Sequence, residues 1–231
     1  MNQPAQTSQT LKKVLHVGCS TRPIIEPFST PEWQEVRLDI DPTVSPDIVA
    51  SMTDLSMIAD GEFDAIWSSH NIEHLYAHEV TQALKEFYRV LKNGGGVHLL
   101  CPDLQTIAEY VAKGNLEGLL YQSPAGPISP LDTIYGLRSA IRMGNHFMAH
   151  RTGFTAYTLA NHLKAAGFSE IYSKRTEFDL AASGFKKLEI PAEKAVVKIT
   201  DKDLNKIMME RDNIEKEPEY SEGLTIPKPG S

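Results

Sequence analysis

Short apolar runs alternate with polar stretches along the first hundred residues of the chain. They fit buried strands over residues 14–17, 36–40, 47–50, 63–68 and 97–101, and two further runs follow at 170–178 and 180–187. Between the fourth and fifth runs, apolar residues recur at the spacing of one helix face: Val80, Ala83, Leu84, Phe87 and Leu91. Glycines at 94–96 predict the end of this helix. Strand–helix alternation predicts a parallel sheet covered by helices.

Other helices are marked by capping residues. Pro31 follows Ser29-Thr30 and predicts a short helix before the second strand. Asp103 predicts the start of a helix with Leu104, Ile107, Ala108 and Val111 on one face. Thr155 begins another, which ends at Gly167.

The region after the fifth strand departs from this regular pattern. Residues 114–130 are rich in glycine and proline, and 131–150 are rich in Arg, His, Tyr and Met. Loops of this length in compact domains often serve as lids or binding loops. Residues 191–231 form a charged extension, in which Thr200 is a candidate helix cap.

Composition narrows the classes of partner and location. The net charge of −7 argues against nucleic acid as the main partner, because phosphate binding requires a basic face. The chain contains no run of about 18 apolar residues, so no membrane span is predicted. Cys19 and Cys101 lie in or just after apolar runs, as packed, reduced thiols do. With a polar N-terminus, these features predict a cytoplasmic protein.

The first strand and the second end in residues that suit a nucleoside ligand. Gly18 ends the first strand, where the backbone approaches a ligand closely, but Ser20 follows where a pyrophosphate loop has glycine. A nucleoside without phosphates demands less of such a loop. Asp39 lies at the tip of the second strand, placed to accept hydrogen bonds from ribose hydroxyls. Asp41, before Pro42, fits a turn cap instead.

Five segments in order resemble the motif series of class I S-adenosylmethionine-dependent methyltransferases, in particular the type 11-like group. They are V-L-H-V-G-C-S (14–20), R-L-D-I-D-P (37–42), D-I-V-A-S-M-T-D-L (47–55), F-D-A-I-W-S-S-H-N-I-E-H-L (63–75) and L-K-E-F-Y-R-V-L-K-N-G-G-G-V-H-L-L-C-P (84–102). The resemblance covers about residues 11–102, and A-A-G-F-S-E-I (165–171) echoes the family's late helix-to-strand turn.

This resemblance implies a fold and a division of the chain. The implied fold is α/β, a Rossmann-like doubly wound, mostly parallel seven-stranded sheet with helices on both faces and a lid insertion after strand five. The domain that binds S-adenosylmethionine would span residues 1–190, with the substrate lid at about 103–154. Residues 191–231 would be a separate extension.

The resemblance also assigns the cofactor site. The residues that it implies are His16, Gly18, Cys19, Ser20, Asp39, Ile40, Met52, Thr53 and Ser69. Gly18 to Ser20 would line the methionine part, Asp39 would hold the ribose, and Met52 and Thr53 would border the adenine. The chain departs from the family at the acid of strand one and at later loop glycines, which are His16, Ser20 and Arg22 here.

Methyl transfer needs in-line positioning and sometimes a general base. The candidate catalytic residues are His70, His146, His150 and Tyr135, and His74 is either a further base or a packed histidine. Arg138 and Arg142 either bind an acidic substrate group or form a solvated helix face. His146 and His150, four apart, also suit a metal, but Glu109 and Glu117 are the nearby acids, and we expect no metal.

The predicted function is transfer of a methyl group from S-adenosylmethionine to oxygen or nitrogen of a small molecule. The departures in the first loop keep two alternatives open. One is a non-methylating reaction of the same cofactor, by cyclisation or elimination, and the other is a cofactor-binding module without catalysis. We expect a monomer or homodimer that binds neither nucleic acid nor membrane.

Overall fold

The computed structural model of the chain describes residues 10–188. The extension predicted at 191–231, with its candidate cap at Thr200, lies outside the described residues. Within 10–188, no helix is long and apolar enough to cross a membrane.

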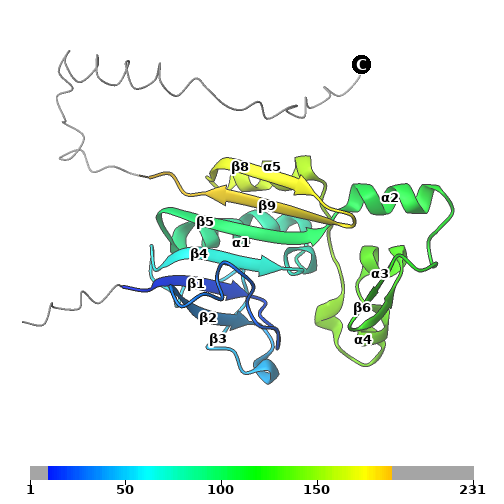
Figure 1. Cartoon of the computed structure of the whole chain (residues 1–231), viewed down its shortest axis with the longest axis horizontal. Coiled ribbons are helices and arrows are strands. Elements are labelled where there is room, and N and C mark those ends of the chain that lie inside the picture. The colour runs from blue at the N-terminus through cyan, green and yellow to red at the C-terminus, as the bar shows by residue number, and fades with distance from the viewer. Residues whose placement is uncertain (1–9, 189–231) are drawn as a thin grey trace, which may run out of the picture. The chain divides into compact units, whose positions relative to one another are not determined.

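Seven strands form one mixed sheet in the order β3-β2-β1-β4-β5-β9-β8 (Figure 1). Strands β1 to β5 pair in parallel, and β9 runs antiparallel to both β5 and β8. All seven predicted strands are present, and the mostly parallel sheet is confirmed. Their bounds are Lys12–Val17 (β1), Trp33–Asp39 (β2), Ile48–Val49 (β3), Phe63–Ser69 (β4), Leu91–Pro102 (β5), Ser169–Arg175 (β8) and Asp179–Phe185 (β9).

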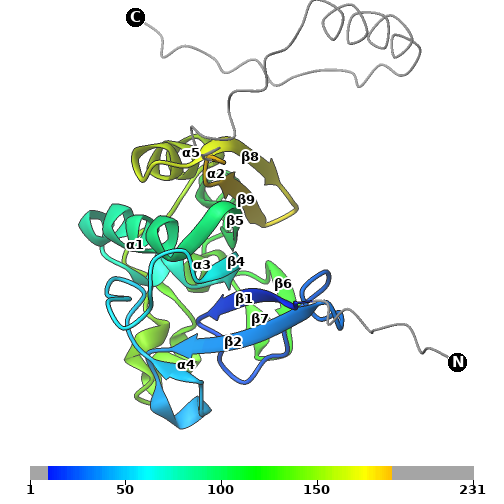
Figure 2. The same ribbon diagram turned by 90° about the vertical axis from the view of Figure 1, so that its left-hand side faces the viewer.

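Two helices cover one face of the sheet (Figure 2). They are α1, Ala77–Val90, and α5, Ala156–Ala165, and both were predicted. Their apolar stripes pack on alternate residues of the strands, such as Leu15 of β1 and Ile66 of β4. Helix α1 ends at Val90, earlier than predicted, because the glycines at 94–96 lie within β5 rather than at the helix end.

The opposite face of the sheet carries the β1–β2 connection, which is a loop. Its side chains Ile24 and Phe28 pack on Val14 and Ala65. The short helix predicted to begin at Ser29–Pro31 is wrong, since the chain turns there and enters β2 at Trp33. The position of β2 explains this, because Trp33 already pairs with Lys12 of β1 and only Glu32 lies between it and Pro31.

A small second group of elements follows β5. It contains α2 (Leu104–Ala112), the hairpin β6–β7 (Tyr121–Ser123 and Gly126–Ile128), α3 (Pro130–Tyr135), α4 (Arg138–Arg142) and the 3-10 turn η3 (His146–Met148). We call residues 103–154 the insertion. It lies beyond the carboxyl ends of β1, β4 and β5 (Figure 1). In open α/β sheets, ligands bind at this edge where the strand order reverses, here between β1 and β4.

Candidate functional site

The loop after β1 is built around Gly18. Its φ of +64° favours glycine, and a Cβ there would overlap the side-chain amide of Asn71. That amide donates to the carbonyl oxygens of Val17 (2.9 Å) and Ser69 (3.0 Å). Asn71 therefore ties the ends of β1 and β4 together across the glycine, and only glycine leaves room for its amide.

Asp39 fixes the next part of the loop. It ends β2, and its carboxylate accepts hydrogen bonds from the backbone N–H of Ser20 (2.8 Å) and of Asp41 (3.0 Å). Its side chain stays partly exposed, and the neighbouring Ile40 is 47% exposed. A carboxylate held in this way has remaining acceptor capacity for the paired hydroxyls of a ribose.

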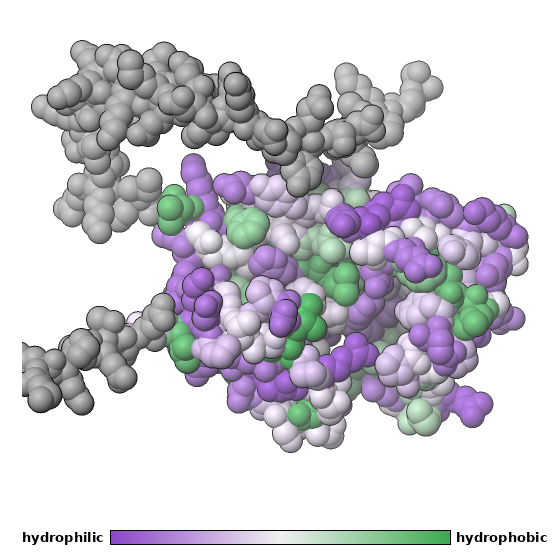
Figure 3. All heavy atoms as spheres, viewed as in Figure 1, coloured by the Kyte–Doolittle hydropathy of each residue, from purple (hydrophilic) through white to green (hydrophobic). Residues whose placement is uncertain are grey.

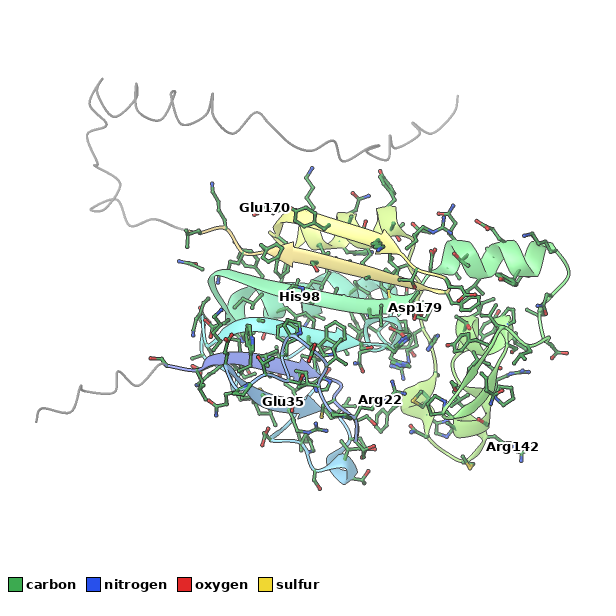
Figure 4. The ribbon with its side chains drawn as sticks, in the orientation of Figure 1. Arg22, Glu35, His98, Arg142, Glu170 and Asp179 are labelled. Carbon is green, nitrogen blue, oxygen red and sulfur yellow. The ribbon has the colours of Figure 1, made fainter. Side chains whose placement is uncertain are left out.

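His16 lies beneath the same loop rather than at its surface. It is buried, and its Nδ1 is 2.7 Å from a carboxylate oxygen of Glu35 on β2. Burial lowers the pKa of His16, and the hydrogen bond with Glu35 opposes this only in part. Arg37 donates to the carbonyl oxygens of Ser20 and Arg22 and so supports the loop from the sheet. Glu35 and Arg22 are labelled in Figure 4.

Other residues predicted to line the cofactor surround this point. Cys19 is fully buried, and burial raises the pKa of its thiol, as expected for a packed rather than a reactive cysteine. Met52 is half-buried against the core. The Thr53 hydroxyl is 2.8 Å from that of Ser51 at the turn after β3.

His70 follows β4 directly in an unusual backbone conformation. Its φ is +54°, which is uncommon for a residue with a side chain, and its N–H donates to the Leu100 carbonyl (2.7 Å). The ring lies between two carboxylates, with Nδ1 3.6 Å from Glu73 and Nε2 3.8 Å from Asp179. Burial alone would lower the pKa of His70, but Glu73 and Asp179 outweigh it and raise that pKa.

Glu73 is the most deeply buried carboxylate near His70. It is 1% exposed, and within residues 10–188 neither of its carboxylate oxygens has a hydrogen-bond partner. His150 Nε2 stands 4.0 Å from Oε1, and the His74 ring lies edge-on to that of His150. Burial opposes ionisation of Glu73, but the three surrounding histidines outweigh it and lower its pKa.

Asp179 and Tyr121 complete the polar groups at this edge. Burial raises the pKa of both side chains, and the charge of Asp179 adds to the effect on Tyr121. Figure 4 shows Asp179 and Arg22 on the side of the sheet that faces the insertion. The space-filling view is hollowed between the sheet and the insertion, with hydrophilic residues around the hollow (Figure 3).

The structure brings together only some of the residues predicted to act on the substrate. His70 and His150 meet at Glu73, whereas His146 is exposed on η3, and Tyr135 is 61% exposed. Arg142 is exposed at the outer end of the insertion (Figure 4).

Arg138 forms an ion pair with Asp132 within the insertion. Its Nε donates to Asp132 (2.8 Å), and its Nη2 reaches the Ser129 hydroxyl (3.3 Å). Asp132 and Ser129 also form a capping box at the start of α3. The guanidinium therefore holds this helix start in place.

Sequence reasoning missed four residues of the site: Asn71, Glu73, Tyr121 and Asp179. The first two stand inside the motif F-D-A-I-W-S-S-H-N-I-E-H-L, so their position just after a strand was a usable signal. Tyr121 on β6 and Asp179 at the start of β9 lie far along the chain from that motif. Only the folded structure brings them to the site, so the sequence carries no signal for either residue.

Comparisons with known proteins agree with this geometry. A family model described as a methyltransferase domain matches residues 15–99. No curated protein matches the chain. Among solved structures, an S-adenosylmethionine-dependent methyltransferase from Methanosarcina mazei is 18% identical, with a TM-score of 0.51 over 78% of this chain and 94% of its own. One from Archaeoglobus fulgidus is 14% identical, with a TM-score of 0.52 over 77% and 87%.

A third similar structure contains small-molecule ligands. It is 1,6-didemethyltoxoflavin-N1-methyltransferase from Burkholderia thailandensis, solved with 1,6-didemethyltoxoflavin and S-adenosylhomocysteine, and it is 15% identical with a TM-score of 0.50 over 77% and 72% of the two chains. In the present chain, the partly exposed carboxylate of Asp39 at the end of β2 suits the ribose of S-adenosylmethionine. Residues 15–99 therefore match a methyltransferase domain, and the chain has the fold of S-adenosylmethionine-dependent methyltransferases, as the order of motifs predicted.

Proposed function

We propose that this enzyme transfers the methyl group of S-adenosylmethionine to an oxygen or nitrogen atom of a small polar molecule. The acceptor would bind between the carboxyl ends of β4 and β5 and the insertion. One observation supports this most directly: polar side chains from separate segments converge there. They are His70 after β4, Tyr121 on β6, His150 after η3 and Asp179 at the start of β9.

The cofactor would lie along the carboxyl ends of β1, β2 and β4. Asp39 would accept hydrogen bonds from the ribose, with Ile40, Met52 and Thr53 around the adenine. The backbone at Gly18, Cys19 and Ser20 would line the methionine part, and Ser69 and His70 would stand closest to the sulfonium. The bound cofactor supplies an electrophilic methyl group, so the protein's task is to align the acceptor with it.

His70 is the residue that we propose to orient the acceptor. Its ring is one-third exposed, and its backbone conformation is held by the hydrogen bond to Leu100. A positive φ retained at a strand end costs free energy, and such conformations cluster at functional sites. His150 supports this arrangement from the insertion, because its Nδ1 donates to the Thr133 carbonyl (2.8 Å) and its Nε2 faces Glu73 behind His70.

Two features favour a small acceptor over a macromolecule. The net charge of −7 disfavours a nucleic-acid substrate. The insertion lies beyond the carboxyl edge of the sheet (Figure 1), and we expect it to limit the size of a molecule that reaches His70. The Burkholderia thailandensis enzyme of similar fold has 1,6-didemethyltoxoflavin bound, which supports a small-molecule acceptor here.

A direct test uses isotope-labelled S-adenosylmethionine with a fractionated metabolite extract. We expect S-adenosylhomocysteine together with a small molecule that carries the labelled methyl group. Formation of methylthioadenosine without a methylated product would contradict the proposal and indicate an elimination or cyclisation. His70→Ala should lower turnover while cofactor binding by calorimetry is retained. Unchanged turnover in that variant would remove His70 from the proposed site.

A further inference from the structure

The buried carboxylate of Glu73 lacks the partners that such a group requires. Both oxygens are inaccessible and unbonded within the described part of the chain. Leaving a buried polar group unpaired costs about 1–3 kcal/mol, and more for a charged one. A carboxylate in this position therefore calls for a partner, and the nearest candidates are histidine nitrogens.

The distances around Glu73 are too long for hydrogen bonds. His70 Nδ1 and His150 Nε2 stand 3.6 Å and 4.0 Å from Oε1. Another histidine–carboxylate pair in this chain is in direct hydrogen-bond contact, with His16 Nδ1 2.7 Å from Glu35 Oε1. Ligand atoms that share a tetrahedral ion at about 2.1 Å stand about 3.4 Å apart. The spacing around Glu73 is thus closer to that of atoms around an ion than to that of a direct pair.

Glu73, His74 and His150 each place a ligand atom within 4.8 Å of the others. His150 donates Nδ1–H to the Thr133 carbonyl, which leaves Nε2 as its free lone pair facing Glu73. His74 has Nδ1 3.1 Å from the Ala149 carbonyl and Nε2 3.2 Å from that of His70. Metal-binding histidines usually donate their second nitrogen to a carbonyl or carboxylate, as here. For His74 to bind an ion, one of its two carbonyl contacts must be exchanged for the metal.

We propose that Glu73, His74 and His150 form a binding site for a divalent transition-metal ion, with zinc the best match to two imidazoles and one carboxylate. A fourth ligand would complete the coordination on the more exposed side of Glu73. His70 marks that side, with its Nδ1 3.6 Å from Oε1. Because His150 comes from the insertion, the ion joins the insertion to the turn after β4. The ion would bind in this way whichever molecule accepts the methyl group.

This site differs from the metal arrangement weighed from the sequence. That arrangement paired His146 with His150 and looked for a third ligand at Glu109 or Glu117. His146 is exposed, and the carboxylate that faces His150 comes from a segment 77 positions earlier, at Glu73.

A metal-free arrangement makes a different prediction from the same residues. If His74 carries a proton on both nitrogens, each N–H satisfies one carbonyl, and the positive ring balances Glu73 without an ion. Metal content separates the two arrangements, because only the proposed site retains zinc stoichiometrically.

The experiment uses the full chain without a histidine tag. The protein is stripped with a chelator, and Zn²⁺, Mn²⁺ or Mg²⁺ is then titrated while thermal unfolding is recorded. We expect one equivalent of Zn²⁺ to be retained after dialysis, measured by elemental mass spectrometry, and to raise the unfolding temperature. Co²⁺ in place of zinc should give the visible absorption of a tetrahedral nitrogen–oxygen site.

Two variants test the ligands and one serves as a matched control. Glu73→Gln and His150→Ala should each weaken Zn²⁺ binding on the order of a hundredfold or more. His78→Ala removes an exposed histidine four positions from His74 and should bind zinc as the wild type does. Circular dichroism checks that each variant is folded. A wild-type protein with no zinc and no thermal shift would overturn the proposal, and so would unchanged affinity in a folded His150→Ala variant.

Discussion

Replacing Gly18 with alanine tests the contact that joins the first loop to the end of β4. The substitution adds a methyl group at a residue with φ of +64°, and that methyl overlaps the Asn71 amide. The amide must then leave its hydrogen bonds to Val17 and Ser69. Two separate penalties follow, one from the backbone and one from Asn71.

The size of each penalty follows from the local structure. A left-handed conformation costs a non-glycine residue about 1–2 kcal/mol. Each neutral hydrogen bond lost costs about 1 kcal/mol, so displacing Asn71 adds about 2 kcal/mol. Gly18→Ala should therefore lower the free energy of unfolding by about 3–4 kcal/mol. In an Asn71→Ala background the second penalty has already been incurred, and the same substitution should cost only about 1–2 kcal/mol.

Urea denaturation followed by circular dichroism measures all four proteins of this double-mutant cycle. Gly114→Ala is the matched control, because Gly114 has φ of +86° and a methyl group added to it would have no atom within 4 Å among the described residues. It should show the backbone penalty alone. Equal costs of Gly18→Ala with and without Asn71 would refute the role assigned to this contact.

Three further substitutions test other parts of the site and its supports. Asp39→Ala should weaken S-adenosylmethionine binding on the order of tenfold to a hundredfold by calorimetry, whereas Asp41→Ala should change it little. Hydrogen bonds from its arginine and serine partners outweigh burial and lower the pKa of Asp132 to about 2. Asp132 therefore contributes about 2 kcal/mol above pH ~4, which is lost as the pH falls toward 2, and urea titrations should show Asp132→Asn converging on the wild type there. Arg175→Ala leaves the fully buried Asp103 without its ion pair and should lower stability by about 3 kcal/mol in the same assay.

The strands and the two covering helices were predictable because one physical requirement governs them. Each of these elements buries a continuous apolar face, so the spacing of apolar residues along the chain shows whether the segment is a strand or a helix. The loop after β1 was less predictable. Pro31 in isolation favours a helix start, but β2 begins two residues later at Trp33, which leaves no room for a helical turn, and the side chains of Ile24 and Phe28 cover the sheet instead.

The site was predictable only where strand ends define it. Asp39 is the last residue of β2 and His70 directly follows β4, and because the carboxyl ends of parallel strands share one edge of the sheet, spacing along the chain places both residues there. Arg138 shows that residue type alone does not establish a substrate-binding role. An exposed arginine in an insertion suggests substrate binding, but Asp132 at the helix start takes up its guanidinium.

The attachment of the insertion bears on how it can act as the lid predicted from the sequence. Backbone hydrogen bonds fix its returning segment: the N–H groups of Arg151 and Thr152 donate to the Glu73 carbonyl in the turn after β4, and that of Leu104, at the start of the insertion, donates to the Phe154 carbonyl. Movement at this end would break these three hydrogen bonds. Opening is therefore easier at the hairpin β6–β7, which is paired over only three residues per strand. Tyr121 begins that hairpin and its ring stacks on Phe178, with centroids 5.2 Å apart, so this stacking is the contact that an opening of the hairpin would have to break.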